Sequence, residues 1–205
     1  MSRSGPAQAL LDAVIAFYGA AGRAGDAGAR AMLDAVRAGL LRAAPARPDA
    51  RTVEASALLP AALGASPVSH VASAIADAIP LFHWRQNPNY NAATMGAAFM
   101  AGYGYVEFAG PKEALFHVPD VRVGLLLLGP ALHYPLHAHP AEEIYHPLTQ
   151  GGLWRRGEEA WRMVPAGNAI HHAPMVPHET KVADRTLLAL YCWRGDTTTE
   201  AVLTA

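Results

Sequence analysis

Residues 134–145 read Tyr134-Pro135-Leu136-His137-Ala138-His139-Pro140-Ala141-Glu142-Glu143-Ile144-Tyr145, and they form the densest set of metal-binding side chains in the chain. In an extended strand the side chains alternate between two faces, so His137 and His139 point to the same side. Residues 140–141 predict a tight connection to a second strand, on which Glu143 and Tyr145 again share one face. The stretch therefore predicts two adjoining strands that direct four candidate ligands toward one point.

These donors suit a divalent transition metal ion, and Zn, Fe, Mn, Co and Ni are all compatible with imidazole, carboxylate and phenol ligands. A His-x-His pair alone is equally typical of a half-exposed surface strand. Histidines further along the chain favour the metal interpretation, because they could supply a further ligand from a later strand. Residues 165–167 (Pro-Ala-Gly) are followed by His171, His172 and His178. We expect one of these later histidines to complete the site from another strand.

The arrangement resembles the two motifs of the cupins, in which His-x-His is followed three or four residues later by Glu, and Pro-x-Gly is followed by His. Two departures are visible. The glycine that should end the Glu-bearing strand is displaced by one residue, to Gly151, and the second-motif histidine lies further from Gly167 than usual. The resemblance implies a double-stranded β-helix, or jelly-roll, and leaves the fourth ligand open between His172 and His178.

Length and composition are those of one globular unit. The chain has 205 residues, of which 52% are apolar and 16% charged, so it can bury one substantial core. The net charge of −1 provides no broad basic surface, and we expect no nucleic-acid partner.

The cellular setting is predicted from what the sequence lacks. Cys192 is the only cysteine, which excludes an internal disulfide and fits a reducing compartment. Residues 1–6 lack the features of a signal peptide, and no apolar run reaches the roughly 18–20 residues of a membrane span. We expect a cytoplasmic protein with no membrane partner; the oligomeric state is left open.

Helical spacing of apolar residues dominates the first part of the chain. Two amphipathic helices are predicted between residues 7 and 44, separated by glycines at 19–22 and at 25, with the second helix beginning near Asp26. The prolines of residues 44–48 predict a break, and shorter helices are expected over 53–63 and 68–79. Residues 82–91 are predicted to form a loop.

From Tyr103 onward, short apolar or alternating segments are separated by turns that contain Gly or Pro, as in an antiparallel sandwich or barrel. Strands are expected over 103–108, 121–128, 143–148, 152–155, 160–164, 168–172, 178–182 and 186–193. The predicted architecture is mainly β: a helical N-terminal region, residues 1–100, packed on a C-terminal cupin barrel, residues 101–205, as one cooperative unit.

A wider resemblance is to the cupin-type dimethylsulfoniopropionate (DMSP) lyases of marine bacteria, of the Q type, and it covers roughly residues 70–196. The segments that carry it are His83-Trp84-Arg85, Gly102-Tyr103-Gly104-Tyr105, Glu107-Phe108-Ala109-Gly110-Pro111, Tyr134, the stretch from His137 to Tyr145, and Trp193-Arg194-Gly195. The specific piece is His-Pro-Ala-Glu-Glu-x-Tyr, because ordinary cupins do not need the tyrosine. The first 65 residues carry no matching motif beyond being helical.

The resemblance implies a β-elimination that yields dimethyl sulfide and acrylate from a small zwitterionic sulfonium carboxylate. It implies the metal ligands His139, Glu143, Tyr145 and His178, and it places Tyr134 and His137 beside the substrate. The sulfonium cation would be held by aromatic faces, through cation–π attraction of about 0.5–2 kcal/mol each. Trp193 and Tyr134 are the main candidates, with Tyr105 and Trp84 after them.

Either tyrosine of the motif can serve as the base. An ordinary tyrosine has a pKa of about 10 and is a poor base at neutral pH, but a nearby divalent cation favours the phenolate. Tyr134 is the expected base if Tyr145 stays a ligand, and Tyr145 is the expected base if substrate displaces it from the metal.

Other functions fit the same pattern. A cupin dioxygenase with Fe(II) needs similar ligands and open coordination positions. A cupin that acts on, or only binds, another small carboxylate is a further alternative. Four other histidines, at positions 70, 117, 133 and 146, are expected to be exposed or locally hydrogen-bonded.

Overall fold

The computed structural model describes residues 5–24 and 26–204. Residues 1–4, which entered the argument about localisation, and Gly25, which entered the helix boundary, lie outside the described residues. The helices of the first half are α1 (Pro6–Ala24), α2 (Ala27–Leu40), α3 (Leu59–Gly64), α4 (Ser69–Ala78), α5 (Ala92–Met95) and α6 (Ala97–Gly102), with 3-10 turns η1 (Glu54–Leu58) and η2 (Ile79–Leu81). None of the described helices is long and apolar enough to cross a membrane.

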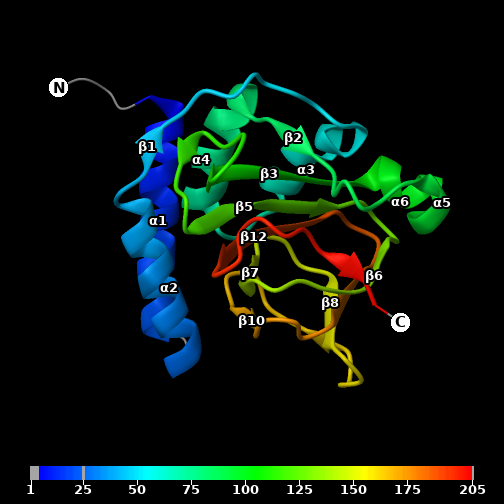
Figure 1. Ribbon diagram of the computed structural model, residues 1–205. Coiled ribbons are helices and arrows are strands. Elements are labelled where there is room, and N and C mark those ends of the chain that lie inside the picture. The colour runs from blue at the N-terminus through cyan, green and yellow to red at the C-terminus, as the bar shows by residue number, and fades with distance from the viewer. Residues whose placement is uncertain (1–4, 25, 205) are drawn as a thin grey trace.

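The two long helices pack side by side along one edge of the molecule (Figure 1). The second begins where expected, because the Asp26 side chain accepts a hydrogen bond from the Ala29 N–H and caps the first turn. The predicted break at 19–22 is wrong, since α1 continues through it. Gly19 and Gly22 lie against Arg37 and Leu33 of α2, so they allow close helix contact rather than ending the helix.

Two sheets form the rest of the molecule, and nearly all of their strand pairs are antiparallel. The larger sheet has the order β1-β4-β3-β5-β12-β7-β10, with β2 paired to β3, and the smaller has the order β13-β6-β11-β8-β9. The strands are β1 (Ala44–Pro45), β2 (Trp84–Arg85), β3 (Tyr103–Gly110), β4 (Phe116–His117), β5 (Val121–Leu128), β6 (His133–Ala138), β7 (Glu142–Pro147), β8 (Gly152–Arg156), β9 (Arg162–Met163), β10 (Ile170–His172), β11 (His178–Val182), β12 (Leu187–Arg194) and β13 (Val202–Leu203).

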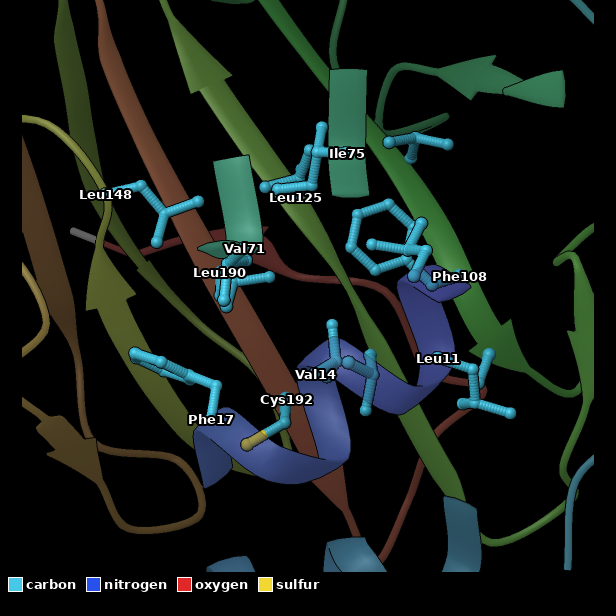
Figure 2. Close-up of a cluster of buried hydrophobic side chains, with 14 of the residues drawn as sticks. Leu11, Val14, Phe17, Val71, Ile75, Phe108, Leu125, Leu148, Leu190 and Cys192 are labelled. Atoms are coloured by element: carbon cyan, nitrogen blue, oxygen red, sulfur yellow. The ribbon is translucent and has the colours of Figure 1, made fainter. Parts of the chain in front are cut away.

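The central strands of the larger sheet are covered on both faces. On β12, Leu188, Leu190 and Cys192 belong to the buried cluster that faces the helices. Figure 2 shows Leu190 and Cys192 beside side chains of α1 and α4. The alternate residues Ala189, Tyr191 and Trp193 belong to a second cluster on the opposite, inner face of the sheet. Because both faces are buried, β12 reads as an almost continuous apolar run.

The expected jelly-roll with an N-terminal helical layer is confirmed, and the differences lie in short edge segments. Strands β1, β4 and β13 were not predicted, and β2 lies within the predicted loop. Each has two residues, too few to show a periodic pattern. Trp84 of β2 packs with Phe82 and Phe108 in the cluster against the helices, so its expected place near substrate is wrong. The division into units at residue 100 stays a prediction.

Candidate metal centre and active-site cavity

Three side chains that the sequence singled out converge inside the barrel: His139, Glu143 and His178, whose ligand atoms all lie within 4.8 Å of one another. His139 directly follows β6, Glu143 lies on β7 and His178 begins β11. The Nε2 atoms of His139 and His178 lie 3.1 Å and 3.2 Å from the same carboxylate oxygen, Oε2 of Glu143. All three residues are buried.

Backbone carbonyl groups set the orientation of each imidazole. The Nδ1 of His139 lies 3.1 Å from the Ala141 carbonyl oxygen, and the Nδ1 of His178 lies 2.9 Å from that of Val176. A carbonyl only accepts hydrogen bonds, so each Nδ1 carries a proton, and each Nε2 presents a lone pair when it is not itself protonated. Two lone pairs and a carboxylate oxygen therefore face one point, and a cation between them would relieve their repulsion. This donor set fits a divalent transition ion.

The second oxygen of Glu143 is held by Trp193, whose indole Nε1 donates a 2.6 Å hydrogen bond to Oε1. Burial alone would raise the pKa of Glu143, but when the imidazoles of His139 and His178 carry a proton on Nε2, their positive charge and their hydrogen bonds to the carboxylate outweigh burial and hold that pKa well below its usual range. Glu143 is therefore a carboxylate at neutral pH, with one oxygen occupied by Trp193 and the other directed at the histidines.

Tyr145 and Tyr134 lie on different strands, β7 and β6, and both line the cavity next to this cluster. Tyr145 follows Glu143 on the same face of β7, and its pKa is raised well above the usual value, first by burial and then by the negative charge of Glu143. Tyr134 stacks on His137 with ring centroids 3.9 Å apart, and its hydroxyl lies 3.2 Å from that of Tyr90. Burial is also the first cause of the raised pKa of Tyr134.

His137 and His172 occupy the space next to His178 without belonging to the three-residue cluster. The ring of His137 lies 4.2 Å from that of His178, and its Nδ1 is held by the Pro135 carbonyl oxygen at 2.8 Å. His172 stacks on the His178 ring at 4.0 Å, and within the described residues neither of its ring nitrogens has a hydrogen-bond partner. Burial lowers the pKa values of both His137 and His172 well below the usual range.

A small cavity of about 40 Å³ opens beside this cluster. Half of its lining residues are aromatic, and the lining comprises Asn87, Tyr103, Tyr105, Arg122, Leu126, Tyr134, Glu143, Tyr145, Tyr191, Trp193, Glu200 and Ala201. Trp193, Tyr134 and Tyr105 thus lie where a substrate could contact them. Trp193 also has close neighbours: the ring of His139 at 4.2 Å and the guanidinium of Arg122 at 4.7 Å from its centroid.

Arg122 and Glu200 are lining residues that the sequence analysis missed. Arg122 is a single charged residue within the apolar run of β5, which is a signal that could have marked it as directed into the barrel. Its Nε donates a 2.8 Å hydrogen bond to buried Glu107, and its guanidinium also pairs with Glu200 at 3.2 Å. Glu200 lies in a short polar segment near the C-terminus, where the sequence shows no comparable signal.

His146 corrects a further expectation. We predicted an exposed or locally hydrogen-bonded histidine, but His146 is fully buried between the sheet and α1, where its ring lies 5.1 Å from that of Phe17. No described residue forms a hydrogen bond with either of its ring nitrogens. Burial lowers the pKa of His146 to about 4, so it is neutral in the folded protein.

Comparison with known proteins identifies the family that this chain resembles in sequence and fold. A family model described as dimethylsulfoniopropionate lyase matches residues 6–189. The chain is 35% identical over 125 residues to the dimethylsulfoniopropionate lyase DddQ of Ruegeria pomeroyi, and this match spans 59% of the chain and 59% of that relative's length.

Solved structures agree along most of the chain. The crystal structure of DMSP lyase DddQ from Ruegeria pomeroyi has a TM-score of 0.72 and 27% identity, and the match covers 79% of this chain and 82% of that one. A structure from the set described as the DMSP lyases RdDddP and RnDddQII has a TM-score of 0.81 over 98% of both chains, at 22% identity, which shows the shared fold. Because the family model spans nearly the whole length, the chain belongs to the dimethylsulfoniopropionate lyase family.

Proposed function

We propose that this protein cleaves dimethylsulfoniopropionate by β-elimination, giving dimethyl sulfide and acrylate. The observation that carries the proposal is the buried His139–Glu143–His178 cluster at the wall of a cavity lined by tyrosines. The cluster can bind a metal, the tyrosines can take a proton, and the chain belongs to a family of lyases of this kind.

The proposed ligands are His139, Glu143, Tyr145 and His178. The first, second and fourth already converge, and Tyr145 lies beside the Glu143 carboxylate. An ion at this position would act as a Lewis acid on the substrate carboxylate and make the α-hydrogens more acidic. Zn, Fe, Mn, Co and Ni all suit this mixed nitrogen and oxygen donor set.

The elimination needs one proton acceptor, and Tyr134 or Tyr145 supplies it. The phenolate oxygen takes a proton from the substrate α-carbon, the C–H electron pair becomes the new carbon–carbon double bond, and the β-carbon–sulfur bond breaks with its electrons on sulfur. Burial opposes ionisation of both phenols, so the phenolate must be favoured by positive charge in the cavity. His137 does not line the cavity; we assign it the role of positioning Tyr134, on which it stacks.

Headspace gas chromatography of the metal-loaded protein with dimethylsulfoniopropionate tests the proposal. We expect dimethyl sulfide at equal rates with and without oxygen, and none after treatment with a chelator. Oxygen-dependent turnover would instead favour a dioxygenase. No gas from a demonstrably metallated sample would reject lyase activity on this substrate.

A further inference from the structure

The cavity contains a second carboxylate, Glu200, in addition to Glu143. The two are separated by a row of cross-strand neighbours on the inner face of the larger sheet: Trp193 of β12 pairs with Arg122 of β5 on one side and with Glu143 of β7 on the other. Adjacent strands lie about 4.8 Å apart, so Arg122 and Glu143 start roughly 10 Å apart at the backbone. Glu200 binds the Arg122 end of this row.

The charge around Glu200 is not fully compensated. Arg122 pairs with Glu107 and Glu200, and Arg85 pairs with Glu107 and Glu113. Three carboxylates therefore share two guanidinium groups within this ion-pair network. Glu107 is almost completely buried between the two arginines and Glu113 is half exposed to solvent, whereas Glu200 is the member of the three that lines the cavity.

The negative charge of Glu200 affects Tyr105, which lines the cavity, and Tyr90, whose hydroxyl lies next to that of the lining residue Tyr134. Burial is the main reason that the pKa values of Tyr90 and Tyr105 are raised to about 12, and the nearby Glu200 carboxylate adds to the effect at both. The contact of Glu200 with Arg122 runs through Oε1 at 3.2 Å. Its carboxylate is thus close enough to the interior to act on a charged ligand there.

Aromatic faces at this end of the cavity are already close to cations. The Arg122 guanidinium lies 4.7 Å from the Trp193 centroid and 5.9 Å from that of Tyr105, and the Arg85 guanidinium lies 5.2 Å from that of Tyr105. Cation–π attraction for a further cation is therefore reduced at these two rings, and a carboxylate is needed to favour a positive charge.

The C-terminal segment holds Glu200 in place. The backbone carbonyl of the next residue, Ala201, accepts hydrogen bonds from the side chains of Asn87 at 2.9 Å and Asn89 at 3.1 Å. Strand β13 then pairs with β6, with Val202 opposite Ala138. The loop after β2 and the strand that precedes His139 thus fix the segment from which Glu200 projects.

We propose that Glu200 forms a cation subsite, which makes the cavity specific for carboxylates that carry a fixed positive charge two methylene groups away. The inference rests on the proposed function: the substrate carboxylate would lie at the Glu143 end and the sulfonium at the Glu200 end. Glu200 would then distinguish the zwitterion from a thioether carboxylate of similar size, which lacks the positive charge.

Two ligands of the same shape test this without turnover: 3-(trimethylammonio)propanoate and 4,4-dimethylpentanoate, an isostere that keeps the carboxylate but lacks the positive charge. Calorimetric titration of the zinc-loaded wild-type protein should show tighter binding of the cationic ligand. Glu200→Gln should weaken that ligand roughly tenfold and leave the isostere unchanged, because only the charge attraction is removed. Glu200→Asp, which keeps the charge, should retain part of the preference and serves as the second variant if Glu200→Gln does not fold.

Glu113→Gln is the matched control, because Glu113 belongs to the same ion-pair network but does not line the cavity. It should leave both affinities unchanged. Three results would overturn the proposed subsite. Glu200→Gln could weaken the binding of both ligands equally, it could leave the binding of both unchanged, or the wild-type protein could fail to bind either ligand. Dimethyl sulfide release from the wild type is measured separately, so loss of the proposed activity and loss of the charge preference are distinct results.

Discussion

On β7, Glu143 and Tyr145 point into the barrel, whereas Glu142 and His146 point to the other side of the sheet. Glu142 forms hydrogen bonds with His171 and Arg194 near the surface, while Glu143 faces two imidazoles in the interior. The two glutamates are adjacent in sequence and chemically identical. Their different surroundings show that the face of the strand, and not the residue type, decides which one can serve a metal.

The largest effect is expected from the inner glutamate. Glu143→Ala removes the oxygen that both histidines face, so the protein should lose its metal and, with it, activity by roughly three orders of magnitude or more. Metal content per chain and dimethyl sulfide release measure both losses. Glu142→Ala is the control and should keep metal and activity. A fully metallated, active Glu143→Ala protein would show that the ligand set is wrong.

The tyrosines of the inner face come next. Tyr134→Phe and Tyr145→Phe should each lower turnover by about 10²- to 10⁴-fold, the range for a lost acid–base group. Only Tyr145→Phe should also weaken metal retention during dialysis. Tyr18→Phe alters a buried tyrosine on the helical side of the sheet and should change neither quantity. Equal metal content in both inner variants contradicts the assignment of Tyr145 as a ligand.

Trp193→Phe should have a smaller effect on the metal. The variant keeps an aromatic ring but removes the N–H that holds Oε1 of Glu143, and loss of such a supporting hydrogen bond weakens metal affinity by about 10- to 100-fold. Competition with a fluorescent chelator measures the affinity. Trp84→Phe, on the helical side, should lower thermal stability without changing the affinity. If Trp193→Phe and Trp84→Phe bind metal equally well, the hydrogen bond from Trp193 to Glu143 does not support metal binding.

His146 offers a test on the outer face that should affect stability and not activity. Its pKa is about 4 when folded against an ordinary value of 6.5, so the unfolded chain binds a proton more readily. Its contribution to stability is therefore complete above pH 6.5 and is lost as pH falls toward 4, by about 3 kcal/mol in total. His146→Leu should flatten the dependence of the unfolding free energy on pH across this window. Denaturant titrations from pH 7 to pH 4 measure it, and an unchanged slope would contradict the prediction.

Much of the fold could be predicted because its main elements have strong local patterns. The bounds of β5 and β11 agree with the expected strands, and α2 begins at the expected cap. The helix break at Gly19 and Gly22 was wrong because small residues either end a helix or let another helix approach, and only the neighbouring α2 decides between them. Two-residue strands such as β13 escaped prediction because their pairing depends on distant partners.

For the site, the spacing within residues 137–145 identified two members of the cluster, His139 and Glu143, and a later histidine was expected to join them. Periodicity could not choose between His172 and His178, since both lie on buried strands. The structure brings Nε2 of His178 to Glu143 and leaves His172 stacked behind it. Arg122 and Glu200 are far from the motif in sequence, so no local pattern connects them with it.

By itself, the sequence determined the types and order of the elements, because helix and strand periods are properties of neighbouring residues. It also determined that metal-binding donors occur in one stretch. Only the tertiary structure decided which face of each strand lines the barrel, since a strand buried on both faces has no polar side to mark it. The row from Glu143 through Trp193 to Arg122, and the place of Glu200 beside it, likewise depend on strand register and long-range packing.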